Sequence, residues 1–133
     1  WTNGRALSAT GSPFGTIRHA EVYHTIARAN NALIFPGLGL GVSVVRATRV
    51  SDEMIYAAAA ALAGLVNEYR PGASLLPSMN DLRLVSATVA MSVAKTAEEQ
   101  GLARTPLTNP INDIYQRMWK PEYPRLEVLS LED

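Results

Sequence analysis

Residues 29–47 read Ala-Asn-Asn-Ala-Leu-Ile-Phe-Pro-Gly-Leu-Gly-Leu-Gly-Val-Ser-Val-Val-Arg-Ala, with two adjacent amides at the mouth of an apolar segment punctuated by glycines. Asn30 and Asn31 each carry a carbonyl acceptor and two N–H donors. Burying such a group unpaired costs about 1–3 kcal/mol, so the amides should meet a polar partner. Pro36 suits the first turn of a helix because it lacks an N–H and its φ is fixed. The stretch therefore predicts a helix over residues 36–47, with the amides just before it and an anion favoured at its start.

The three glycines of this segment, Gly37, Gly39 and Gly41, need a compensating role, because each costs a helix about 1 kcal/mol relative to alanine. One role is to remove side chains so that another backbone can pack closely. The other is a dinucleotide-binding fingerprint, which requires Gly-x-Gly-x-x-Gly after a strand. Position 42 is Val and no strand signal directly precedes the segment, so the spacing favours close packing.

Composition bounds the class of protein. With 133 residues, of which 47% are hydrophobic and 18% charged, the chain has the composition of one soluble globular domain or part of one. Twelve basic residues balance twelve acidic residues, so nucleic acid and acidic membrane surfaces are not expected partners. The absence of cysteine excludes disulfides and thiol catalysis and is compatible with a reducing cytosol. Because Trp1 rather than a methionine begins the chain just ahead of a strand, we expect a fragment of a longer protein.

The first third of the chain predicts strands. Residues 5–10 contain the small and apolar Ala6, Leu7 and Ala9 and precede the turn-forming Gly11-Ser12-Pro13, which is typical of a short, buried parallel strand. In open α/β sheets, ligands gather just beyond the carboxyl ends of such strands. Residues 16–17 and 22–26 predict a small hairpin containing His19 and His24. No third metal ligand lies near these histidines, so we interpret both as surface residues and predict no metal site.

The rest of the chain predicts three more helices. Ser51 is a candidate N-cap, followed by acidic residues 52–53 in the first turn and an alanine-rich apolar face, where the acids complement the helix dipole. A third helix is expected over residues 81–100, capped by Asn80 or Asp81 and ended by Gly101. Asn109-Pro110 opens a short fourth helix that ends before Pro121. Three aromatic residues lie near the end of the chain, Tyr115, Trp119 and Tyr123. Because no basic groove surrounds them, they predict packing of a terminal arm rather than stacking on bases.

Several of these motifs together resemble one enzyme family. "ATGSPFG", "NNALIFPGLGLG" and "SDEM" followed by an alanine-rich helix occur in the order found in the C-terminal part of malic enzymes, and the bacterial NAD-linked members and the malolactic enzymes are the most similar. The resemblance covers nearly the whole chain, and it implies that residues 1–133 are the C-terminal part of an NAD-binding domain. It implies an α/β fold, the C-terminal portion of a Rossmann-like domain, mainly helical here with one short strand, a small hairpin and about four helices.

The resemblance also implies the chemistry. Malic enzymes convert L-malate to pyruvate and CO2 with NAD and Mn2+ or Mg2+, in the cytoplasm, as dimers or tetramers. Asn31 matches the asparagine that holds the malate carboxylate, and Asn30 lies beside the substrate and the nicotinamide. Gly11 and Ser12 are expected to flank the nicotinamide end of the cofactor. The proton-transfer residues, metal ligands and glycine-rich fingerprint lie upstream in the family, so no catalytic or metal-binding residue is assigned here.

The sequence departs from the family pattern at one position and leaves open two alternative functions and one alternative role for Asn31. Arg28 stands where the family usually has Gln, which puts the local hydrogen bond of that Gln in question. The stretch "NEYRPGASLLP" is similar to malolactic enzymes, which convert L-malate to L-lactate and CO2. A non-catalytic helical interaction domain is the third possibility, and it predicts no polar site at Asn30 and Asn31. Asn31 could also be a structural cap rather than a substrate ligand.

Overall fold

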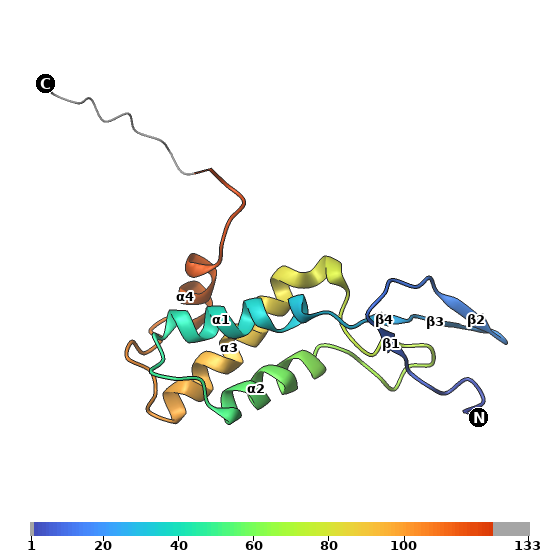
Figure 1. Cartoon of the computed structure of the whole chain (residues 1–133), viewed down its shortest axis with the longest axis horizontal. Helices are drawn as coiled ribbons and strands as arrows, with labels where there is room; N and C mark the ends of the chain where they lie inside the picture. The colour runs from blue at the N-terminus through green and yellow to red at the C-terminus, as the bar shows by residue number, and fades with distance from the viewer. Residues whose placement is uncertain (1, 124–133) are drawn as a thin grey trace, which may run out of the picture.

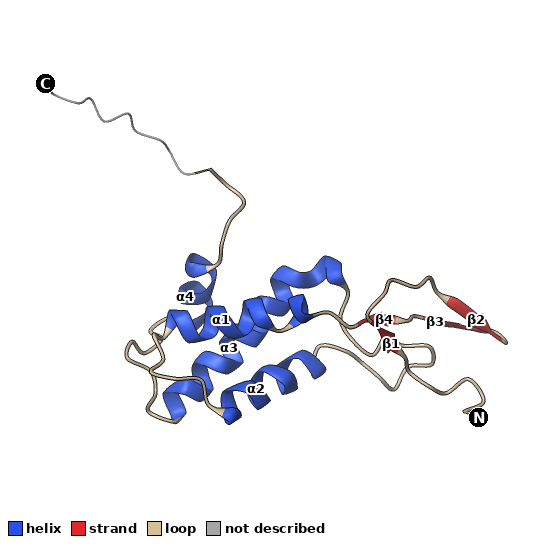
Figure 2. Cartoon of the chain, in the orientation of Figure 1, coloured by secondary structure: helices blue, strands red, loops and turns tan. Residues whose placement is uncertain are grey.

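The computed structural model describes residues 2–123, which form a helical body joined to a small strand region (Figure 1). The strands and hairpin lie at one end and the helices at the other, as Figure 2 shows by colour. In chain order the elements are β1 (Ala9–Thr10), β2 (Ile17–His19), β3 (Val22–His24), β4 (Ala27–Arg28), the 3-10 helix η1 (Asn31–Leu33), α1 (Phe35–Val44), α2 (Asp52–Ala63), the 3-10 helix η2 (Met79–Asp81), α3 (Leu82–Glu99) and α4 (Pro110–Arg117).

The first predicted strand is shorter than expected. Only Ala9–Thr10 is extended and paired, and it is half-buried rather than buried. It does lie in a parallel pair, with β4 as the partner, in the register Ala9 opposite Ala27 and Thr10 opposite Arg28. A parallel strand becomes fully buried only when layers cover both faces of its sheet. Within residues 2–123 this sheet has two strands, so the prediction of a buried strand over residues 5–10 was wrong in extent and burial.

The hairpin is confirmed. Strands β2 and β3 pair antiparallel with Arg18 opposite Tyr23, and Ala20 turns the chain with a φ of 51°. Arg18 and Glu21 form an exposed ion pair at 3.0 Å, worth about 0–1 kcal/mol. The rings of His19 and His24 meet edge to face, with centroids 6.4 Å apart. In the part of the chain that the structure describes, no group of three potential metal ligands includes them.

Helix α1 begins one residue earlier and ends three residues earlier than predicted, at Phe35 and Val44, and Pro36 lies in its first turn. Two of its glycines explain its tight packing on α3. A Cβ at Gly37 would lie 2.6 Å from the Cβ of Val89, and a Cβ at Gly41 would lie 2.6 Å from the Ala90 carbonyl oxygen. Gly39 faces open space with nothing within 4 Å. Close packing is therefore confirmed for two of the three glycines and wrong for Gly39.

The caps of the other helices follow their sequences with one exception. Ser51 caps α2 through its Oγ, which accepts from the Met54 N–H at 3.2 Å, and Asn109 caps α4. Gly101, with a φ of 67°, follows the C-terminal end of α3. Asp81 occupies the N-cap position of α3, as predicted, but without a capping side-chain bond, because Met79–Asp81 is the separate turn η2, whose Asn80 N–H donates to Ser78 Oγ.

Helix α3 lies at the centre of the helical body and packs against both α1 and α2, while α4 contacts α1 and α3 (Figure 1). Burying one valine or leucine side chain contributes about 1.5–3 kcal/mol, so the shared core holds these helices together. The main buried cluster comprises Leu33, Val45, Met54, Ala58, Val85, Val89, Val93, Ala94 and Ala97. Leu33 is the core residue nearest in sequence to the amides, and it anchors the segment between the strands and α1.

Candidate functional site

The two predicted site segments leave the same end of one parallel strand pair. Strand β1 is followed by Gly11 and Ser12, and β4 is followed by Ala29 and Asn30. The Ala29 N–H donates to the Thr10 carbonyl oxygen at 2.8 Å, which ties the two exits together. Because carboxyl ends of parallel strands are where ligands gather in open α/β sheets, this junction between the strands and the helices is the candidate site.

Asn30 has a structural role that the sequence analysis did not assign to it. Its Oδ1 accepts from the Ala32 N–H at 2.9 Å and so caps η1. The side chain remains exposed. Since the carbonyl oxygen already has a protein partner, the two amide N–H donors are the groups that Asn30 offers to a ligand.

Asn31 opens η1 and is not its cap. Its side chain is exposed and has no hydrogen-bond partner within residues 2–123. The amides stand just before α1, as the sequence analysis predicted, and the 3-10 turn η1 lies between them and its first residue, Phe35. The structure leaves the polar capacity of Asn31 available, in a segment held by the buried Leu33 two residues later.

Both amides line one hollow of about 520 Å³. Asn30 and Asn31 supply its polar wall. Its apolar wall comes from Ala29, Leu33 and Ile34 beside the amides and from two leucines distant in the sequence, Leu62 at the end of α2 and Leu76 in the α2–α3 connection. The sequence analysis missed these two leucines, because an apolar residue near a helix end or before a proline carries no signal of a ligand site.

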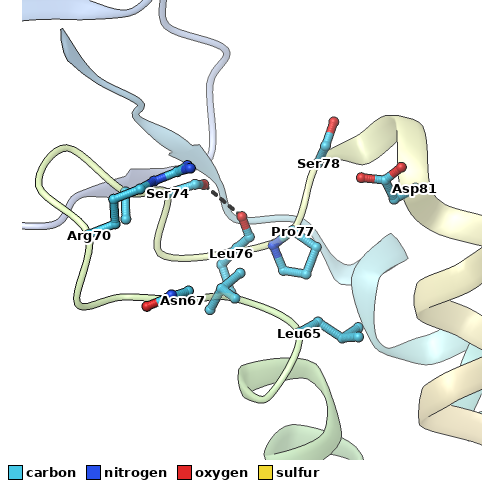
Figure 3. A pocket seen from close by; sticks show the side chains of 10 residues that line it. Leu65, Asn67, Arg70, Ser74, Leu76, Pro77, Ser78 and Asp81 are labelled. Carbon is cyan, nitrogen blue, oxygen red and sulfur yellow. Dashed lines mark hydrogen bonds between the residues drawn. The ribbon is translucent and has the colours of Figure 1, made fainter.

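A second hollow of about 320 Å³ adjoins the first, and Leu76 lines both (Figure 3). Its polar groups come from the α2–α3 connection and η2, and include the Arg70 guanidinium and the Asp81 carboxylate. In Figure 3 the Leu76 side chain extends toward Asn67, while its carbonyl oxygen accepts from Ser74 Oγ at 2.6 Å. The two hollows thus differ in character, the first presenting neutral amides and the second charged groups.

The remaining predicted residues lie around this site rather than in it. Gly11 and Ser12 are exposed and do not line the amide hollow, although the Thr10 Oγ1 donates to the Ser12 carbonyl oxygen at 2.6 Å and orders that loop. Arg28 is exposed on β4 and does not line the hollow either. Tyr115, Trp119 and Tyr123 are all exposed, Tyr123 fully, and what covers them stays a prediction.

Asp52 and Glu53 lie in the first turn of α2 and outside the amide hollow. The pKa of Glu53 is lowered, first by a hydrogen bond from the Gln100 side chain and then by its own backbone N–H and by Ser51. Residues 2–123 contain no group of three or more histidine, aspartate or glutamate side chains placed to hold a metal ion. None of the helices described in this range is long and apolar enough to cross a membrane.

Comparison with known proteins identifies similar sequences. Residues 1–98 match the family described as "Malic enzyme, NAD binding domain". NAD-dependent malic enzyme 3 of Bacillus subtilis is 50% identical over 123 residues, which is 92% of this chain and 22% of that protein. The malolactic enzyme of Lactococcus lactis is 46% identical, over 92% of this chain and 23% of that enzyme. The NAD-dependent malic enzyme of Shewanella denitrificans is 48% identical, over 98% and 24%. The chain therefore spans less than a quarter of the length of these curated relatives.

A solved structure is also similar. The crystal structure of the malic enzyme from Pyrococcus horikoshii Ot3 matches with a TM-score of 0.64 and 31% sequence identity, over 84% of this chain and 24% of that one. The matched part of the fold is the arrangement described above, a mainly helical portion of a larger α/β domain.

Proposed function

Because this chain belongs to the malic enzyme family, we propose that it is the C-terminal part of the NAD-binding domain of a decarboxylating malate dehydrogenase. The whole enzyme would convert L-malate to pyruvate and CO2, using NAD and Mn2+ or Mg2+, in the cytoplasm. Like the family, it would be a homodimer or homotetramer. The observation that carries the proposal is that Asn30 and Asn31 line one hollow beyond the carboxyl end of β4.

The role of the amides is to orient the substrate. Among the described residues the side-chain N–H groups of Asn31 have no protein partner, and Asn30 offers its own N–H groups because only its Oδ1 is engaged, by the Ala32 N–H. Two sets of N–H donors on one wall suit a carboxylate, which only accepts hydrogen bonds when ionised. We assign Asn31 to the malate carboxylate and Asn30 to the space between malate and the nicotinamide. Holding the reacting carbon in place matters because a shift of about 1 Å can cost on the order of a hundredfold in rate.

The cofactors fit this chain to different degrees. Gly11 and Ser12 lie in an exposed loop beside the amides, and a Cβ on Gly11 would meet nothing within 4 Å, so the loop leaves room for the nicotinamide end of NAD. NAD would accept the hydride from malate. The described residues offer no set of metal ligands, so they do not fit Mn2+ or Mg2+, and we assign the metal to the rest of the enzyme.

The test is Asn31→Ala in the enzyme of family length that contains this chain. We expect KM for malate to rise and kcat to fall, because an orienting contact acts on the bound substrate and on the transition state. Loss of a hydrogen bond to a charged group costs about 1.5–3 kcal/mol, or roughly ten- to over a hundredfold in kcat/KM. Asn112→Ala, on the exposed surface of α4, is the matched control and should leave the kinetics unchanged. Normal kinetics with a lowered melting temperature would make Asn31 structural and refute its substrate role.

A malolactic enzyme is the second candidate, and the similarity to the Lactococcus lactis enzyme supports it. Both reactions begin with the same substrate, so the amides would have the same role. Product analysis separates the two: pyruvate with net NADH formation supports the malic enzyme, and lactate without net NADH supports the malolactic enzyme. A non-catalytic interaction domain has less support, because the exposed amides line a hollow rather than pack against other elements.

A further inference from the structure

Leu76 occupies a position that no role in the proposed reaction yet explains. It lines both the amide hollow and the polar hollow beside it. The two hollows have volumes of about 520 and 320 Å³, and Leu76 is the residue that they share, so we call its side chain the partition between them. Figure 3 shows the polar side of this partition, with Arg70 and Ser74 on one flank and Asp81 on the other.

The partition is held rigidly. The Leu76 carbonyl oxygen accepts from Ser74 Oγ, and Pro77 restricts the backbone of the residue before it to extended conformations. The side chain is half-buried and packs against the main buried cluster. Because Leu76 is held by a hydrogen bond, a following proline and core packing, its displacement to admit a larger ligand would cost free energy.

We propose that Leu76 is a specificity-determining residue that limits the site to small 2-hydroxy dicarboxylic acids. Its side chain closes the space in which a substituent on the carbon chain of the substrate would lie. The inference rests on the proposed function, since it requires the amide hollow to hold malate. It adds that the size limit comes from the α2–α3 connection, a segment far in sequence from the amides. Beyond Leu76, the polar hollow offers space and the charge of Arg70 to a larger or more polar substituent.

The experiment compares Leu76→Ala with Leu75→Ala in the enzyme of family length. Leu75 is the adjacent leucine, is 41% exposed and lines neither hollow, so it is a matched control. Turnover is measured with L-malate and with 3-methylmalate and 3-isopropylmalate, and inhibition constants of the substituted malates are measured against L-malate. One methylene in a close-fitting pocket is worth roughly 10–200-fold. We expect Leu76→Ala to raise the preference for 3-isopropylmalate over L-malate by at least about tenfold, and Leu75→Ala to leave it unchanged.

Leu76→Val guards against a folding defect in the alanine variant, because it removes one carbon and retains a branched side chain. It should shift the preference in the same direction by a smaller amount, with a near-normal melting temperature. An unchanged preference in folded Leu76→Ala or Leu76→Val would overturn the inference, as would an equal shift in Leu75→Ala. If the wild-type enzyme turns over malate but these variants show no shift in preference, the role of Leu76 is refuted and the proposed function is retained. Wild-type enzyme without malate turnover would refute both.

Discussion

Replacing glycines of α1 by alanine should have opposite effects on stability at positions that differ only in the face of the helix. Alanine favours a helix over glycine by about 1 kcal/mol at any of them. At Gly39 a new Cβ meets nothing within 4 Å, so Gly39→Ala should stabilise the fold by about 0.5–1 kcal/mol. At Gly37 the new Cβ would lie 2.6 Å from the Val89 Cβ and 2.8 Å from the Ser86 carbonyl oxygen.

The contacts at Gly37 cannot be relieved by a change of rotamer, because they involve a backbone oxygen and a Cβ. Helix α1 would have to move away from α3, and such overpacking costs about 1–3 kcal/mol. The helix-propensity gain is common to both variants, so the difference in unfolding free energy between Gly39→Ala and Gly37→Ala should equal the overpacking cost, about 1–3 kcal/mol. Gly41→Ala should resemble Gly37→Ala, since its Cβ would lie 2.6 Å from the Ala90 carbonyl oxygen.

Urea unfolding of the three purified variants beside the wild type measures these differences through the transition midpoints, provided that the denaturant slopes agree. The wild type should fall between Gly39→Ala, above it, and the other two variants, at or below it. Gly37→Ala as stable as Gly39→Ala would show that α1 and α3 are not in close contact there. That result would refute the packing explanation for the glycines.

Three further predictions concern the Ser51 cap, the Glu53 carboxylate and the activity of this chain by itself. Ser51→Ala should lower the unfolding free energy by about 1–2 kcal/mol, measured by urea unfolding, because the buried Oγ caps the Met54 N–H and donates to Gln100 Oε1 at 2.6 Å; wild-type stability in this variant would contradict the cap. The pKa of Glu53 is lowered from its ordinary value of 4.5, so the ionised carboxylate stabilises the fold above that pH, and this stabilisation is lost as the pH falls through the lower pKa of the folded state. Glu53→Gln should therefore show a weaker loss of stability on acidification below about pH 4.5 than the wild type, and identical acid titrations would be inconsistent with this. Finally, the 133-residue chain alone should not decarboxylate malate, which a metal-dependent assay of the purified chain checks.

Some residues of the candidate site could be predicted from the sequence, and others could not. The amides could be found, because two adjacent polar side chains beside Leu33 and Ile34 would need a partner if they were buried, and the structure leaves both exposed beside a hollow. The different roles of Asn30 and Asn31 could not be predicted. Only the dihedral angles of the turn show that Asn30 caps η1 and leaves Asn31 without a protein partner in the described residues. Leu62 and Leu76 were missed because their place in the site depends on how α2 and the α2–α3 connection return to the amides.

Local chemistry in the sequence determined the four helices and the hairpin. Ser51, Pro36 and the Asn109-Pro110 pair act within one helical turn, where a cap or a fixed φ has its whole effect, so these helices could be predicted to within a few residues at most ends. Tertiary structure decided what depends on distant partners. The β1–β4 pairing joins residues far apart along the chain, and Gly39 differs from Gly37 and Gly41 only by which side of α1 faces α3. Identical residues in one sequence pattern thus acquire different roles, because packing depends on three-dimensional neighbours that no local pattern contains.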